Sequence, residues 1–98
     1  MLQIKNKSIQ YHISALNELK ELMTALKTLE NPADIDNAMV INDHLTEVLN
    51  SGEKHFKHFV TECNYSKESL ELYILFLRNS MVIYNIFYII QIFIIKLN

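Results

Sequence analysis

Hydrophobic residues between positions 8 and 30 recur every three or four residues, the spacing that places them on one face of an α-helix. They are Ile9, Ile13, Leu16, Leu19, Leu22, Met23, Leu26 and Leu29. Charged residues such as Glu18 and Lys20 fall mainly on the remaining surface, and good helix formers dominate the segment. The pattern therefore predicts an amphipathic helix over residues 8–30.

A helix-start signal follows at Asn31-Pro32-Ala33-Asp34. The side chain of Asn31 can cap the helix, Pro32 suits the first helical position, and the Asp34 carboxylate would meet the positive end of the helix dipole. We expect a second helix over residues 32–50. Asn50-Ser51-Gly52 resembles a helix C-terminus, with Gly52 supplying a left-handed conformation.

A short third helix is expected over residues 53–63, with Phe56, Phe59 and Val60 on one side. Asn64-Tyr65-Ser66 would end this helix, and Ser66 can cap a fourth helix over residues 66–97. Only one glycine and one proline occur in 98 residues, too few for the turns of a β-sandwich or barrel. The sequence therefore predicts an all-α fold, a small bundle of about four helices in a single domain over residues 1–98.

The last segment is apolar around most of a helix. From Leu70 onwards almost every residue is Leu, Ile, Val, Met, Phe or Tyr. On a helical projection the main polar stripe is narrow and consists of Glu71, Arg78, Asn85 and Lys96. A helix of this composition has to be buried over nearly its whole circumference.

Three environments are compatible with this segment. Protein could surround it, either the other helices or those of a second subunit. Lipid could also do so, because residues 81–97 reach the lower end of the roughly 17–25 residues that a membrane-spanning helix needs. Asn85 and Gln91 are unfavourable in that setting. The many Ile, Tyr and Phe residues allow a third interpretation, a strand-like tail over residues 81–95, although turn residues are lacking there.

Composition and charge narrow the classes of function. The net charge is −2 and no basic face emerges, which argues against nucleic-acid binding. The single cysteine, Cys63, cannot form an internal disulfide, and no apolar leader opens the chain, so we expect a cytoplasmic location. Residues with AT-rich codons (Ile, Asn, Lys, Tyr and Phe) make up 41 of 98 positions, which suggests an AT-rich genome such as that of a phage or another mobile element.

No pattern of catalytic residues stands out. His44, His55 and His58 could converge on a metal if their helices packed antiparallel, but neither Glu-x-x-His nor His-Glu-x-x-His occurs. Cys63 lies on the apolar side of its helix, where cysteine is usually an inert small hydrophobe. One glycine cannot make a phosphate-binding loop. We therefore expect no catalytic residue, no cofactor and no metal.

The dominant functional feature is a surplus of apolar surface. We expect a non-enzymatic, regulatory protein that binds a protein partner and forms a homo-oligomer through its apolar C-terminal helix. The residues expected at that interface are Leu77, Met81, Tyr84, Phe87, Tyr88, Ile92 and Phe93. The alternative is a cytoplasmic helical module whose residues 81–97 anchor it in a membrane, for example as a regulator of membrane or lysis machinery.

Overall fold

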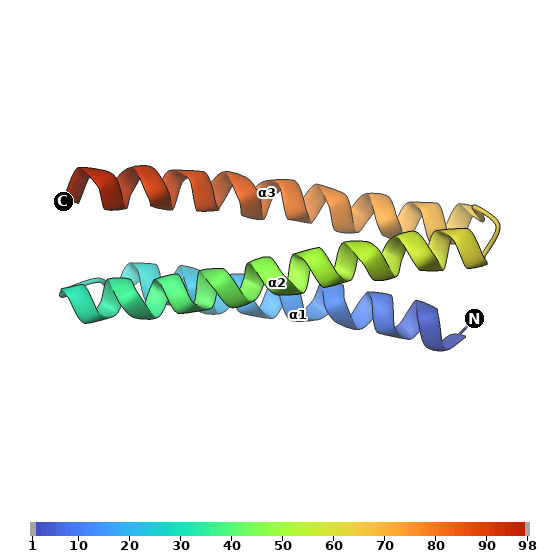
Figure 1. The fold of residues 1–98 in the computed structure, drawn as a ribbon, viewed down its shortest axis with the longest axis horizontal. Helices are drawn as coiled ribbons and strands as arrows, with labels where there is room; N and C mark the ends of the chain where they lie inside the picture. The colour runs from blue at the N-terminus through green and yellow to red at the C-terminus, as the bar shows by residue number, and fades with distance from the viewer. Residues whose placement is uncertain (1, 98) are drawn as a thin grey trace.

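The chain folds into three antiparallel helices, as a computed structural model shows for residues 2–97, with the side chains of residues 93, 94 and 97 outside the described part (Figure 1). They are α1 (Leu2–Lys27), α2 (Pro32–Glu62) and α3 (Lys67–Leu97). The molecule measures 49 × 20 × 16 Å, and residues 2–97 contain no strand. The predicted all-α fold is confirmed, whereas the predicted number of helices is wrong.

The predicted start of α2 is confirmed in detail. The side-chain oxygen of Asn31 accepts hydrogen bonds from the backbone N–H groups of Ala33 and Asp34, at 3.0 and 3.2 Å. The Asp34 carboxylate in turn accepts from the N–H of Asn31 at 3.2 Å, so each residue satisfies a donor of the other. Pro32 occupies the first turn, where its missing N–H removes no helical bond.

The expected break between residues 50 and 53 does not exist, because α2 continues through Gly52. This glycine is buried in the middle of the helix, beneath α3. A Cβ atom at this position would lie 2.8 Å from Cζ of Phe76 and 3.2 Å from Cβ of Tyr11. Gly52 therefore allows α1 and α3 to approach α2 closely, and it does not end a helix. The helices predicted over 32–50 and 53–63 are one.

The turn between α2 and α3 forms where the sequence predicts it. Asn64 and Tyr65 adopt positive φ values of 51° and 58°, which reverse the chain direction. The N–H of Tyr65 donates to the carbonyl of Val60 at 2.9 Å and so satisfies one of the last carbonyls of α2. The hydroxyl of Ser66 accepts from the N–H of Ser69 at 3.2 Å, the expected cap of α3.

Aromatic rings at the centre of the bundle form its core. Phe56 of α2 is fully buried and stacks on Phe76 and Tyr73 of α3, with ring centroids 4.7 and 6.0 Å apart. Aliphatic side chains extend this core along the bundle, including Leu22 and Leu45. The core also explains why α1 begins at Leu2, six residues before the predicted start: Ile4 packs against it.

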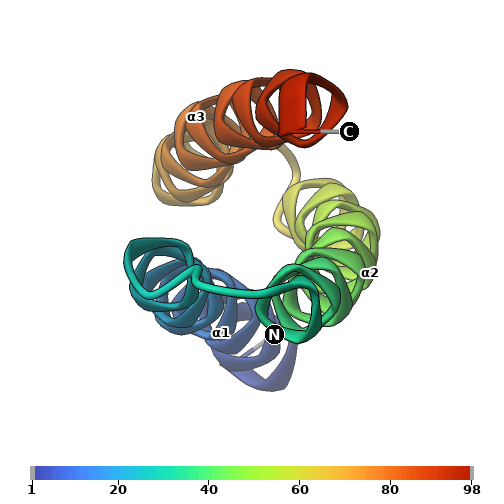
Figure 2. The same ribbon diagram turned by 90° about the vertical axis from the view of Figure 1, so that its left-hand side faces the viewer.

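α1 and α2 pack closely along their length, whereas α3 contacts chiefly α2 and touches α1 over a short stretch. In the view along the bundle, α3 stands apart from α1 (Figure 2). Within the described residues, two polar contacts join α1 to α3: the ion pair between Lys5 and Glu68, at 2.5 Å, and the contact of His12 with Asn79, at 2.7 Å. Much of the circumference of α3 therefore remains uncovered.

Candidate interaction surface

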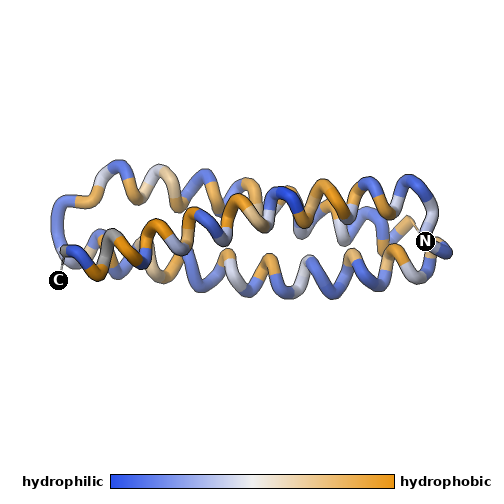
Figure 3. Tube along the Cα trace, turned by 90° about the horizontal axis from the view of Figure 1, so that it is seen from above, coloured by the Kyte–Doolittle hydropathy of each residue, from blue (hydrophilic) through white to orange (hydrophobic). Residues whose placement is uncertain are grey.

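α3 exposes a long apolar surface on the side opposite the core. Its inner side carries buried residues, among them Phe76 and Ile83, while Met81, Tyr88 and Ile89 on the outer side are 63–68% exposed. Hydrophobic residues follow one another along the C-terminal half of this helix, whereas α1 and α2 alternate between hydrophobic and polar (Figure 3). Apart from Leu70 in its first turn and Tyr84, which turns toward α2, we call the exposed apolar residues of α3 its outer face. They are Ile74, Leu75, Met81, Val82, Tyr88, Ile89, Ile92 and Ile95.

The outer face carries no charge over most of its length. Between Arg78 and Lys96 the sequence contains no acidic or basic residue, and Asn85 and Gln91 are its exposed polar side chains. The four residues of the predicted polar stripe, which include Glu71 and Lys96, are all exposed. Polar groups on the other side are satisfied within the helix: the buried hydroxyl of Ser80 donates to the carbonyl of Phe76 at 2.9 Å.

Three of the seven predicted interface residues lie on the outer face of α3. Met81, Tyr88 and Ile92 belong to the outer face. Tyr84 is 45% exposed but turns toward α2, with its hydroxyl 3.5 Å from the side-chain oxygen of Asn50.

The other three predicted residues lie elsewhere. Leu77 is partly buried, and Phe87 is buried in the core of the bundle, because it lies on the inner side of α3. The side chain of Phe93 lies outside the described residues. Sequence reasoning missed five residues of the outer face: Ile74, Leu75, Val82, Ile89 and Ile95. Seven-residue spacing groups them with Met81 and Tyr88 but does not distinguish the outer side of α3 from the inner side.

The four histidines lie in separate local contacts. His44 of α2 pairs with Glu18 of α1, whose second carboxylate oxygen is buried without a donor in the described part of the chain. His55 packs against Tyr11 and contacts the carbonyl of Ser51 at 2.9 Å. No group of three or more metal-ligating side chains occurs among the described residues.

The surroundings of His12 shift its pKa. Burial lowers its pKa below the ordinary value of 6.5. Its ring lies edge-on to Phe56 and Phe76, and its Nε2 is 2.7 Å from the side-chain nitrogen of Asn79. Since the Asn79 amide also donates to the carbonyl of Leu75, at 3.1 Å, Nε2 acts as the acceptor and the imidazole is neutral. This arrangement joins α1 to α3.

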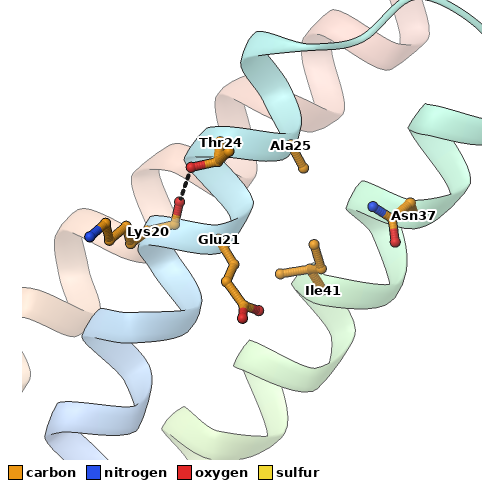
Figure 4. A pocket seen from close by; sticks show the side chains of 6 residues that line it. All are labelled: Lys20, Glu21, Thr24, Ala25, Asn37 and Ile41. Atoms are coloured by element: carbon orange, nitrogen blue, oxygen red, sulfur yellow. Dashed lines mark hydrogen bonds between the residues drawn. The ribbon is translucent and has the colours of Figure 1, made fainter.

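A shallow hollow lies between α1 and α2 (Figure 4). It is lined by Lys20, Glu21, Thr24, Ala25, Asn37 and Ile41. The Thr24 hydroxyl donates to the carbonyl of Lys20 at 3.0 Å, a bond within the helix. Lys20 and Glu21 are exposed to solvent, so the hollow offers neither a buried polar group nor an enclosed apolar volume that would hold a ligand.

Comparisons with known proteins found no match to this chain among protein-family models, curated proteins or solved structures. Within the described residues, one helix is long and apolar enough to cross a membrane, over Lys67–Ile92. Length and composition are the whole basis of that finding, and the core helices of soluble proteins satisfy the same criteria.

Proposed function

We propose that this chain is a small, non-enzymatic regulatory protein that binds protein surfaces and associates with itself through the outer face of α3. The observation that supports the proposal is the exposed, uncharged apolar surface between Arg78 and Lys96. Soluble monomers rarely leave a continuous apolar patch of more than a few hundred Å² in water, and larger patches usually mark partner surfaces. The proposal includes a cytoplasmic location, which suits a chain whose single cysteine has no internal disulfide partner.

While the bundle stays folded, burying this surface against a protein costs less free energy than burying it in lipid. Exposed charges on α2, such as Asp36, Asp43 and Glu47, would enter the bilayer with α3 if the intact bundle were immersed. Asn85 and Gln91 are exposed on α3 itself and would lose water without gaining a partner in hydrocarbon.

The test is the size of the untagged full-length protein, extracted without detergent and measured by light scattering after size-exclusion chromatography. We expect a discrete oligomer. Ile89→Lys, which adds a charge to the middle of the outer face, should raise the concentration of half-dissociation at least tenfold. Thr61→Lys adds the same charge to an exposed site on α2 and serves as the matched control. A wild-type protein that is monomeric at every concentration would overturn the proposal.

A second candidate function is membrane attachment through residues 81–97. Arg78 and Lys96 bracket the uncharged part of α3, the arrangement that places basic groups near the two surfaces of a bilayer. Over 17 uncharged residues, 79–95, a helix rises about 26 Å, slightly less than the hydrocarbon thickness. Protein that stays with membranes through a high-salt wash, and leaves with detergent, would establish this alternative in place of self-association.

A further inference from the structure

The outer face of α3 repeats every seven residues. Exposed apolar neighbours occur at Ile74-Leu75, Met81-Val82 and Tyr88-Ile89, and Ile95 continues the series one repeat later. A seven-residue apolar repeat is what keeps one stripe of a helix facing another helix, as in a coiled coil. Lipid tails require no such period. A helix packed along this stripe would bury the whole repeat, so a helix is a cover that fits the outer face.

Polar residues occur in the same register as this repeat. Glu71, Arg78 and Asn85 are spaced by seven residues and lie between the apolar pairs, and Lys96 follows eleven residues after Asn85. All four are exposed. Glu71 makes an ion pair of 3.9 Å with Lys67, one turn earlier, which a closer partner could replace at little cost because both side chains are in solvent.

The order of these charges selects an orientation for a second copy of α3. In a parallel pair, Glu71 would face Glu71, and Arg78 would face Arg78, so like charges would repel at both layers. In an antiparallel pair centred between Met81 and Asn85, Glu71 lies opposite the partner's Ile95 and beside its Lys96, at both ends of the pair. The same register places Arg78 against the face of the partner's Tyr88, where a cation is attracted to the ring.

We infer that two copies of this chain pair through antiparallel packing of their outer faces, over a seam from Glu71 to Lys96. The seam is about 38 Å long, at 1.5 Å per residue. It has Ile74 opposite the partner's Ile92, and Met81 opposite the partner's Asn85. The inference rests on the proposed self-association and adds to it the surface, the orientation and the register.

Disulfide trapping tests the register. In a Cys63→Ser background, a chain carrying Ile74→Cys is mixed with a chain carrying Ile92→Cys, and both are oxidised. A disulfide needs Cα atoms within about 7 Å. We expect the mixed dimer to cross-link. Neither single variant should cross-link with itself, because like positions are separated by 18 residues, about 27 Å of helix.

Charge reversal tests the orientation with Cys63 left in place, so that an unstable cysteine-free background cannot obscure the answer. Glu71→Lys and Lys96→Glu should each raise the concentration of half-dissociation threefold or more, and the double variant should return it to the wild-type value. Lys54→Glu, at an exposed site on α2, is the matched control.

The outcomes separate the two proposals. Self-cross-linking of Ile74→Cys, or charge reversals without effect in a protein that is still dimeric, would overturn the antiparallel seam and leave self-association standing. A protein that is monomeric by light scattering would overturn both.

Discussion

Gly52 is the residue on which the packing of all three helices depends, because its missing side chain makes room for Phe76 and Tyr11. Gly52→Ala raises helix propensity by about 1 kcal/mol. It also places a methyl group 2.8 Å from the Phe76 ring, which is 1% exposed and stacks on Phe56, and such overpacking costs about 1–3 kcal/mol. We expect a net loss of about 1 kcal/mol in the free energy of unfolding, measured by urea titration.

The control for Gly52→Ala is Lys54→Ala, which lies on the exposed side of the same helix. Changes at such positions stay within about 0.5 kcal/mol. If Gly52→Ala were as stable as Lys54→Ala, the close approach of Phe76 would not limit the size of this side chain.

His12 makes stability depend on pH. Burial lowers its pKa in the folded chain below the value of 6.5 that the unfolded chain has. The folded state thus favours the neutral ring, and its stabilising effect is complete above pH 6.5 and decreases as the pH falls toward the folded pKa. Protonation would also turn Nε2 from an acceptor into a donor facing the Asn79 amide. We expect the free energy of unfolding to be lower at pH 5.5 than at pH 7.5.

The variant that isolates this effect is His12→Gln, which keeps an acceptor but does not titrate in this range. The difference between the two pH values should shrink in His12→Gln and persist in His58→Gln, whose histidine is exposed on α2. An unchanged difference in His12→Gln would assign the pH dependence to another group.

At the scale of the element, α2 begins at the best-defined helix terminus in the chain. Asn31→Ala removes the acceptor for the N–H groups of Ala33 and Asp34. Such a loss costs about 1 kcal/mol, which should appear as a lower midpoint of urea unfolding with unchanged slope. Asn37→Ala, at an exposed position of the same helix, should leave the midpoint in place.

This terminus also shows what the sequence alone could predict. The partners of a helix cap are adjacent in the chain, so Asn31 and Pro32 were sufficient to locate the start of α2. Gly52 was misinterpreted because its role depends on Phe76, 24 residues away, and Asn-Ser-Gly is locally compatible with a helix end. The predicted second and third helices form one continuous helix because of a contact between residues that are distant in the sequence.

An apolar surface on the C-terminal helix was expected from the sequence, but only some of its residues were named. Composition alone showed that α3 has more apolar surface than a small bundle can cover. Which side faces the core depends on how α3 is rotated against α2, which no local pattern states. Phe87 was therefore assigned to the interface although it packs inside, and Ile89 was missed although it is 63% exposed.

At the scale of the whole molecule, the C-terminal half of α3 contributes to the core as well as to the outer face. Removal of residues 79–98 would uncover the core side of α1 and α2 by taking away Ile83, Phe87 and Ile90, each at most 8% exposed. Since burying one such side chain contributes roughly 1.5–3 kcal/mol, the truncated chain should lose its cooperative thermal transition. Circular dichroism checks this. A soluble, cooperatively unfolding monomer of residues 1–78 would contradict it.

The unequal packing of the three helices has a consequence for how the molecule opens. The α1–α2 hairpin has the closer contacts, whereas α3 is held chiefly by one neighbour. Local opening of part of α3, with α1 and α2 still packed, is then of lower free energy than global unfolding, and the amide protons of α3 should exchange with solvent ahead of those in the hairpin. Such an excursion exposes the inner side of α3, and with it the core, to proteases and chaperones. Pairing of two copies would close this route, so that assembly would set the lifetime of the chain in the cell.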